Sequence, residues 1–285
     1  MLPDTLKVKL QYVLPKHLLS RLVGWLASAK AGWLTTSLIE LFIKQYNVNM
    51  NEAQKESAED YDTFNDFFTR PLKEGVRPID ADKDALIFPV DGAISQYGKI
   101  EENQIFQAKG HQYSIEALLG GNKEIAKEFY NGEFMTVYLS PKDYHRIHMP
   151  LSGKLTDMTF VPGELFSVNP VTTENVPGLF ARNERVVSIF ETEHGKMAMV
   201  LVGATIVASI ETVWAGTIAP RHQAVAHTNY TNKVQDVVLE KGEEMGRFKL
   251  GSTIVMLYQP NKVEFGSHQP GDTTRLGQRC GTLKS

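Results

Sequence analysis

The sequence lacks the features of an exported or membrane-spanning protein. Its 285 residues include one cysteine, Cys280, so no disulfide can form within the chain and a reducing compartment is favoured. No apolar run reaches the roughly 18 residues that a spanning helix needs, and the longest candidate, residues 197–210, is predicted to be a buried strand. The first residues also lack the basic, apolar and small segments of a secretory signal. We therefore expect a protein that is neither exported nor inserted across a bilayer.

The sequence also has a small net charge and no complete metal-binding pattern. The formal charge of −3 gives no general reason to expect nucleic acid as a partner. His145 and His148 are three residues apart, but neither the His-Glu-x-x-His pattern nor a third ligand accompanies them, so zinc is disfavoured. The ordinary composition and the length instead predict a globular protein of one large or two modest domains.

The first 46 residues differ from the rest in charge and in periodicity. Six lysines and arginines against two acids give them a charge of +4 and leave −7 to the remainder. Two helices are predicted, one beginning at Pro15 and one after Gly32. Their apolar faces contain Leu18, Leu19, Leu22, Val23 and Leu26, then Trp33, Leu34, Leu38, Leu41 and Phe42. Basic amphipathic helices with tryptophans favour an anchor lying on a membrane surface, and a helical hairpin packed on the protein body is the alternative.

From Leu86 onward the pattern changes to short β-type runs separated by glycine, proline and polar turns. These runs are 86–90, 93–95, 134–139, 155–161, 186–190, 197–214, 234–239 and 254–258, and only 114–119 and 123–130 look helical. We expect an α+β fold in which a β-rich, barrel- or sandwich-like body follows the N-terminal helices. The predicted division is 1–62, amphipathic helices with an acidic connector, and 63–285, the β-rich body. Thr63 with Asp66 is typical of a helix start, and the aromatic residues at 64–68 are predicted to plug the space between helices and body.

The sequence Lys249-Leu250-Gly251-Ser252-Thr253 precedes the last of these runs and is a place where the chain could cut itself. Glycine has no side chain to shield its carbonyl and tolerates a strained backbone. Addition of the Ser252 hydroxyl to the carbonyl of Gly251 would exchange the amide for an ester. The same residues are also ordinary turn-to-strand chemistry, so the pattern alone leaves both interpretations open.

A second cluster, residues 143–150, contains both candidate histidines. Imidazole has a pKa near neutrality, so one of them could take the proton from Ser252 while Asp91 orients its ring, as in a nucleophile–base–orienter triad. Asp91 precedes Gly92 and also fits a plain hairpin turn. The loop 161–169, which carries Phe166 and Ser167, is predicted to be a lid or a wall of a substrate pocket.

Five motifs, in this order, closely resemble those of the bacterial phosphatidylserine decarboxylase family. They are FNDFF (64–68), FPVDG (88–92), DYHRIHMP (143–150), FARNER (180–185) and LGST (250–253). The resemblance extends from the N-terminal helices to about Tyr258. It implies a proenzyme that cuts itself between Gly251 and Ser252 into a β chain, 1–251, and an α chain, 252–285.

The resemblance also implies roles for the site residues. Asp91 would orient His148, and His148 would activate Ser252 for the cleavage. After the ester forms, β-elimination and loss of ammonia would leave a pyruvoyl group at the start of the α chain. That group would serve as the electron sink that pyridoxal phosphate supplies in other decarboxylases, so neither pyridoxal phosphate nor a metal is expected.

The implied enzyme is a carboxy-lyase. Phosphatidylserine would form a Schiff base with the pyruvoyl group made from Ser252 and would leave as phosphatidylethanolamine and CO2. His145 is the implied acid and base of this half-reaction, and Tyr138, Phe166 and Ser167 are further candidates for placing the substrate. The implied partners are phosphatidylserine in the membrane, the β and α chains of one precursor, and a second copy in a homodimer. The implied location is peripheral, on the cytoplasmic face of the inner membrane.

Three other functions remain open at this point. A pyruvoyl decarboxylase of a soluble amino-acid derivative would cut itself but would not bind membranes. A serine hydrolase that uses Asp91, His148 and Ser252 on an external ester would keep an intact chain. A membrane-docked binding module would neither cut itself nor depend on Ser252.

Overall fold

A computed structural model of the chain describes residues 4–205, 209–219, 224–231, 234–249 and 252–284. Its described strands form four sheets, and all pairings between named strands are antiparallel. The largest has nine strands in the order β12-β7-β8-β9-β15-β5-β2-β17, with β13 also pairing with β7. Three smaller sheets have the orders β11-β10-β14-β6, β1-β18-β16 and β3-β4. The predicted α+β fold with a β-rich body is confirmed, in the sandwich form rather than as a closed barrel of the described strands.

The strands of the large sheet are β2 (Gly92–Lys99), β5 (Glu133–Leu139), β7 (Gly153–Val161), β8 (Arg185–Thr192), β9 (Gly195–Val202), β12 (Ala226–Asn229), β13 (Val238–Leu239), β15 (Ser252–Tyr258) and β17 (Thr273–Thr274). The other strands are β1 (Ala85–Ile87), β3 (Gln104–Ala108), β4 (His111–Ser114), β6 (Arg146–His148), β10 (Ile210–Thr212), β11 (Gly216–Ala219), β14 (Glu244–Phe248), β16 (Val263–Phe265) and β18 (Arg279–Leu283). The run predicted at 197–214 is therefore two strands, β9 and β10, in different sheets.

The strand β15 lies at the centre of the body, between β9 and β5, and all seven of its residues are buried. Alternate side chains of a strand point to opposite faces of the sheet. Ile254 and Met256 accordingly join the core between the large sheet and the two smaller sheets, whereas Val255 and Leu257 join the core beneath β3, β4 and the body helices. Each fully buried aliphatic side chain contributes about 1.5–3 kcal/mol, so the strand is anchored on both faces.

The helices of the body are α5 (Ile115–Leu118), α6 (Lys123–Lys127), α7 (Pro170–Asn175) and α8 (Leu179–Arg182). The prediction of only two helices in this half was wrong, because α7 and α8 follow the loop 161–169. The signal that was missed is Asn169, whose side chain caps Thr172 at 3.0 Å, followed by Pro170 at the first helical position.

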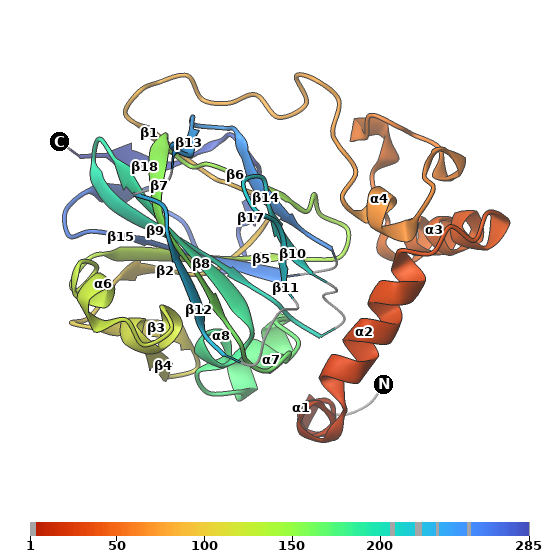
Figure 1. Ribbon diagram of the computed structural model, residues 1–285, viewed down its shortest axis with the longest axis horizontal. Coiled ribbons are helices and arrows are strands. Elements are labelled where there is room, and N and C mark those ends of the chain that lie inside the picture. The colour runs from red at the N-terminus through yellow and green to blue at the C-terminus, as the bar shows by residue number, and fades with distance from the viewer. Residues whose placement is uncertain (1–3, 206–208, 220–223, 232–233, 250–251, 285) are drawn as a thin grey trace.

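The N-terminal segment contains α1 (Asp4–Val13), α2 (Lys16–Ala27), α3 (Trp33–Tyr46) and α4 (Phe64–Phe68), with short 3-10 turns η1 (Met50–Glu52) and η2 (Ala58–Asp60) before α4. Figure 1 shows α1 to α3 at one side of the body and the C-terminus at the other. The two predicted helices are confirmed as α2 and α3, and α1 was not predicted. The Thr63 side chain caps Asp66 at 3.1 Å, as the sequence indicated. None of the described helices is both long and apolar enough to cross a bilayer.

Most of the large apolar side chains predicted on one face of α2 and α3 are exposed, whereas Phe42 packs against α4. Trp25 and Trp33 are 71% and 74% exposed, and the leucines of the same faces other than Leu19 are about half exposed or more. The buried residues of α2 are small or polar, among them Ser20 and Ala27, whereas α3 buries Thr35 and the apolar Ile39. The exposed apolar side chains favour the surface-anchor prediction over a hairpin packed through its whole apolar side, and membrane binding stays a prediction.

The short helix α4 joins the two parts of the chain. Phe64, Phe67 and Phe68 are buried and lie in one cluster with residues of α2 and α3. Phe42 of α3 contacts all three aromatic rings, with centroids 5.1 to 6.0 Å apart. The predicted plug between the helices and the body is therefore confirmed.

Candidate active site

Ser252 is the first residue of β15 and is completely buried. It lies opposite Leu139, the last residue of β5, and its side chain faces the core that contains Leu139 and Ile254. The Ser252 hydroxyl has no hydrogen-bond partner among the described residues. A buried hydroxyl without a partner destabilises the folded state by about 1–3 kcal/mol. Such atoms mark strained, catalytic or ligand-binding positions. Gly251, on the other side of the predicted cleavage point, lies outside the described residues.

His145 is the second completely buried polar group of this region. Its ring lies 4.0 Å from the Phe68 ring, and neither ring nitrogen has a partner in the part of the chain that the structure describes. Its main-chain oxygen accepts a hydrogen bond from the amide of Phe248, 3.1 Å away in β14. Burial first, and the nearby charge of Arg70 second, lower the pKa of His145 well below its usual value. The imidazole is therefore neutral at pH 7, and its role as an acid and base stays a prediction.

His148, in contrast, is held at both ring nitrogens. Nδ1 lies 2.7 Å from the carbonyl oxygen of Gly242, and since a carbonyl can only accept, Nδ1 carries the proton. Nε2 is then the acceptor for the Tyr144 hydroxyl, 3.2 Å away. Burial is the main cause that lowers the pKa of His148. The ring is thus neutral, and because its Nε2 accepts from Tyr144 and Ser252 Oγ has no partner among the described residues, the role of His148 as the base for Ser252 stays a prediction.

The turn that holds His148 requires a glycine. Gly242 has a φ of +86°, and a Cβ at this position would lie 2.9 Å from a side-chain carbon of Ile79. A larger residue would displace the carbonyl that fixes the tautomer of His148. Gly242 is therefore a positioning residue that the sequence did not reveal.

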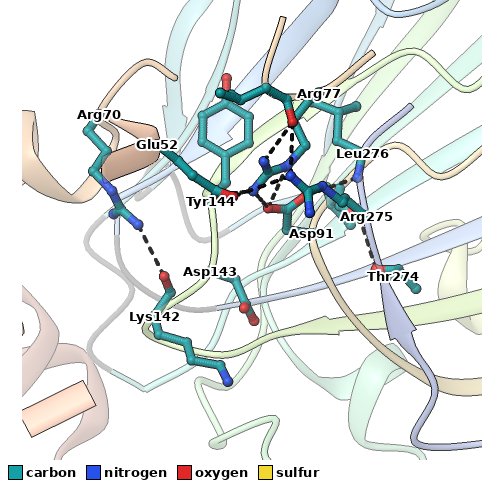
Figure 2. Close-up of polar contacts among 12 residues, drawn as sticks. Glu52, Arg70, Arg77, Asp91, Lys142, Asp143, Tyr144, Thr274, Arg275 and Leu276 are labelled. Carbon is teal, nitrogen blue, oxygen red and sulfur yellow. Dashed lines mark hydrogen bonds and ion pairs between the residues drawn. The ribbon is translucent and has the colours of Figure 1, made fainter. Parts of the chain in front are cut away.

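Asp91 is bound by an arginine that the sequence did not reveal (Figure 2). Arg77 donates to both carboxylate oxygens, at 3.0, 3.0 and 2.6 Å, and the amide of Leu276 adds a bond of 2.9 Å. The same guanidinium bonds Glu52 at 2.6 Å. The contacts of Asp91 and of His148 in the described residues do not include one another, so the orienting role of Asp91 stays a prediction.

The loop between β5 and β6 is fixed from two sides. The carboxylate of Asp143 accepts from both the amide and the hydroxyl of Ser140 at 2.7 Å. Arg146 donates to the main-chain oxygen of Thr69 at 2.9 Å and bonds Glu244 at 2.9 Å. The bond from Arg146 to Thr69 connects this loop, which contains His145 and which we call the histidine loop, to the segment that follows α4.

The three candidate substrate-binding residues lie apart from the Ser252 side chain. Tyr138 is opposite Thr253, so its side chain is on the other face of the large sheet. Phe166 is buried on that same face, between the charged ends of Lys16 and Arg182, 4.1 and 4.7 Å from its ring centre. The amide of Ser167 donates to the side chain of Gln11 in α1 at 3.0 Å. The predicted lid therefore packs on the N-terminal helices, and its role in substrate binding stays a prediction.

A family model described as phosphatidylserine decarboxylase matches residues 64–282, and a second, described as PSD, matches residues 6–47. The chain belongs to the phosphatidylserine decarboxylase family. The first match contains Asp91, His145, His148 and Ser252, and the second covers α2 and α3. Among the described residues, no group of three or more His, Cys, Asp or Glu side chains is placed to hold a metal ion.

Curated relatives support this membership over almost the whole chain. A protein of Pseudoalteromonas atlantica is 64% identical over 282 residues, which cover 98% of this chain and 99% of the relative. One of Shewanella frigidimarina is 59% identical over 285 residues, which cover 99% of each chain, and one of Alteromonas mediterranea is 62% identical over 277 residues, 96% and 85% of the two. All three are named phosphatidylserine decarboxylase proenzyme.

Proposed function

We propose that this chain is the proenzyme of a pyruvoyl-dependent carboxy-lyase that converts phosphatidylserine into phosphatidylethanolamine and CO2. The proposal rests on the membership of the phosphatidylserine decarboxylase family and on the relatives that are named proenzymes. The observation that carries it is the Ser252 hydroxyl, which is completely buried at the start of the central strand without a partner among the described residues. A hydroxyl in this state suits chemistry on its own backbone rather than on a large external ester.

The self-cleavage starts from this hydroxyl. His148 takes the proton from Ser252 Oγ as the oxygen adds to the carbonyl of Gly251, and the peptide bond gives way to an ester. Removal of the α-proton of Ser252 then expels the Gly251 carboxylate. Water replaces the nitrogen of the remaining dehydroalanine, ammonia leaves, and a pyruvoyl group heads the α chain, 252–285.

The pyruvoyl group supplies a carbonyl that can accept the electrons left behind when CO2 departs. The residues of this chain do the rest. His145, neutral and without a partner among the described residues, exchanges the proton at the carbon that loses the carboxylate. The buried Phe68 ring, packed against His145, limits the access of water to this imidazole.

The N-terminal helices bind the membrane that contains the substrate. Their exposed tryptophans and leucines form an apolar surface, and the first 46 residues carry a charge of +4 that attracts anionic lipid. We place the protein as a peripheral homodimer on the cytoplasmic face of the cell membrane. A pyruvoyl decarboxylase of a soluble amino-acid derivative is disfavoured, because it has no use for this surface.

The test is release of CO2 from vesicles that contain carboxyl-labelled phosphatidylserine. Wild-type protein should release labelled CO2, and Ser252→Ala should release none. Ser188→Ala is the matched control, because this second serine is also fully buried with an unpartnered hydroxyl among the described residues, in β8. Equal activity of Ser252→Ala and Ser188→Ala would refute the proposal.

A further inference from the structure

A cavity of about 230 Å3 lies beside the histidine loop, where the end of α3 meets the body. Its wall includes Asn47, Arg70, Arg77, Asp91, Lys142 and Tyr144. Most of the charged groups in this wall already have partners. Arg77 is shared by Asp91 and Glu52, and Asp143 is bound by Ser140. The cavity is therefore polar. Two cations in its wall, Arg70 and Lys142, form no direct ion pair among the described residues, although the charges of Asp143, Asp91 and Glu52 act on Arg70 and oppose the lowering of its pKa by burial.

Arg70 is the unusual group. Its side chain is only 3% exposed, its Nη2 donates to the main-chain oxygen of Lys142 at 3.1 Å, and its guanidinium lies 5.4 Å from the centre of the Phe67 ring. Figure 2 shows the guanidinium directed at the Lys142 carbonyl. Nε and Nη1 are buried and have no partner in the described part of the chain. Buried arginines normally satisfy all their donors, and oxyanions are the acceptors that a guanidinium binds best.

The position of Arg70 connects it to the chemistry. It lies two residues after Phe68, whose ring touches His145, and the bond from Arg146 to Thr69 fixes the segment between them. The charge of Arg70 also lowers the pKa of His145. An anion bound at Arg70 would therefore lie close to the histidine that we propose exchanges a proton with the substrate.

We propose that Arg70, assisted by Lys142 at the cavity wall, binds the phosphodiester of the phospholipid headgroup. This assignment rests on the proposed function. In a phosphoserine headgroup only three bonds separate the phosphorus from the carbon that loses the carboxylate. A phosphodiester site must therefore be a close neighbour of the residue that protonates that carbon, as Arg70 is of His145.

The other anion of the headgroup, the carboxylate, is a poorer occupant. Its charge passes into the electron sink as CO2 leaves, so a guanidinium bound to it would stabilise the ground state more than the transition state. The phosphodiester keeps its charge throughout the reaction. A cation bound to it holds the substrate without opposing the decarboxylation.

Calorimetry on the uncut Ser252→Ala protein tests the assignment without any catalysis. Three probes separate the anions: glycerophosphoethanolamine has the phosphodiester alone, L-serine has the carboxylate alone, and inorganic phosphate tests for a free-phosphate site. Glycerophosphoethanolamine should bind, and adding Arg70→Gln should weaken it by about 10- to 100-fold, the usual worth of a charge-assisted hydrogen bond. Arg70→Lys should restore part of the loss. Arg275→Gln is the matched control, an exposed arginine outside the cavity wall that contacts Glu52, and should change nothing.

Three results would overturn the assignment. One is unchanged binding of glycerophosphoethanolamine in Arg70→Gln. Another is a loss that falls on L-serine instead, which would make Arg70 a carboxylate site. The third is binding of inorganic phosphate through Arg70 without binding of the diester. If Arg70→Gln does not fold, Arg70→Lys and the surface change Lys142→Ala replace it, and both should still weaken the diester several-fold.

The processed enzyme provides the second test. Arg70→Lys should cut itself normally, and its KM for phosphatidylserine should rise about 10-fold while kcat changes much less. A merely structural role would lower the fraction of cut protein and leave KM unchanged. Because the calorimetric test uses uncut protein, a wild type that releases no CO2 would refute the proposed function and leave the phosphodiester site standing.

Discussion

The N-terminal helices and the β-rich body break the ordinary rules of folding in opposite ways. On α2 and α3, apolar side chains such as Trp25 and Trp33 are exposed although soluble proteins usually bury such faces. In the body, polar atoms of Ser252, His145 and Arg70 are buried without partners among the described residues. Each of these exceptions lowers the free energy of unfolding, so the requirements of folding do not explain them.

The difference between the two regions indicates what each contacts. An exposed apolar and basic face suits a lipid surface, whereas buried hydroxyl, imidazole and guanidinium groups suit a reacting headgroup. The two regions meet at α4, where Phe68 touches His145 and Phe42 of α3 touches Phe68. The site that we propose for the headgroup therefore lies directly against the helices that we propose lie on the membrane.

The largest expected effects separate the two histidines of the body. His148→Ala should remain largely uncut, because the base for Ser252 is lost. His145→Ala should be cut but should turn over about 100- to 10,000-fold more slowly, the usual contribution of a general acid or base. Intact mass and CO2 release measure the two effects, and His194→Ala, a histidine bonded to Lys284 at the edge of the body, is the control. An uncut His145→Ala protein would show that the roles are assigned wrongly.

The next largest effect concerns membrane binding by α2 and α3. Trp25→Ser with Trp33→Ser should weaken binding to anionic vesicles on the order of 100-fold, from the loss of two large apolar side chains. Because both are exposed, the thermal unfolding temperature should hardly change. A control that removes two exposed valines of the body, Val213 and Val238, should leave vesicle binding intact. If both proteins lost vesicle binding equally, the exposed tryptophans of the N-terminal helices would not be a specific membrane-binding surface.

A smaller effect concerns the stability of the body. Burial raises the pKa of Glu184 from 4.5 to about 7. The folded state then holds the proton more tightly than the unfolded state, so stability is highest below pH 4.5 and falls as the pH rises to 7. The loss is at most about 3.4 kcal/mol, from a pKa difference of about 2.5 units at 1.36 kcal/mol per unit. Glu184→Gln should remove this loss, which denaturant unfolding at pH 4 and pH 8 will measure. A variant that is no more stable than wild type at pH 8 would contradict the assignment.

The smallest effect lies at the contact between α2 and the loop 161–169. Lys16, only 6% exposed, bonds Glu164 at 2.9 Å and lies over the Phe166 ring. Lys16→Met keeps the apolar stem and removes the charge, so it should loosen the contact between α2 and the loop 161–169 by about 1–2 kcal/mol. Faster hydrogen exchange confined to that loop and α1 is the expected result. Lys30→Met is the control, since its partner Asp62 is exposed. If hydrogen exchange in the loop 161–169 and α1 is the same in both variants, the Lys16 contact does not stabilise these segments.

Local signals predicted the elements that depend on local residues. Pro15 and Gly32 correctly placed the starts of α2 and α3, and Thr63 the start of α4. The continuous apolar, β-type run 254–258 located β15, which begins two residues earlier at Ser252. The site residues that the sequence missed, Arg70 and Arg77, have no local pattern. Arg77 acts through Asp91, 14 residues away, and Arg70 through a loop 72 residues away, so only the folded chain brings them into place.

The central claim is that Ser252 becomes the first residue of a new chain, and the intact mass of purified protein tests it most directly. The prediction is two chains, 1–251 and 252–285, the smaller about 17 Da lighter than a chain that begins with serine, the balance of losing ammonia from a pyruvoyl terminus. A single uncut chain that still releases CO2 from phosphatidylserine would contradict the account.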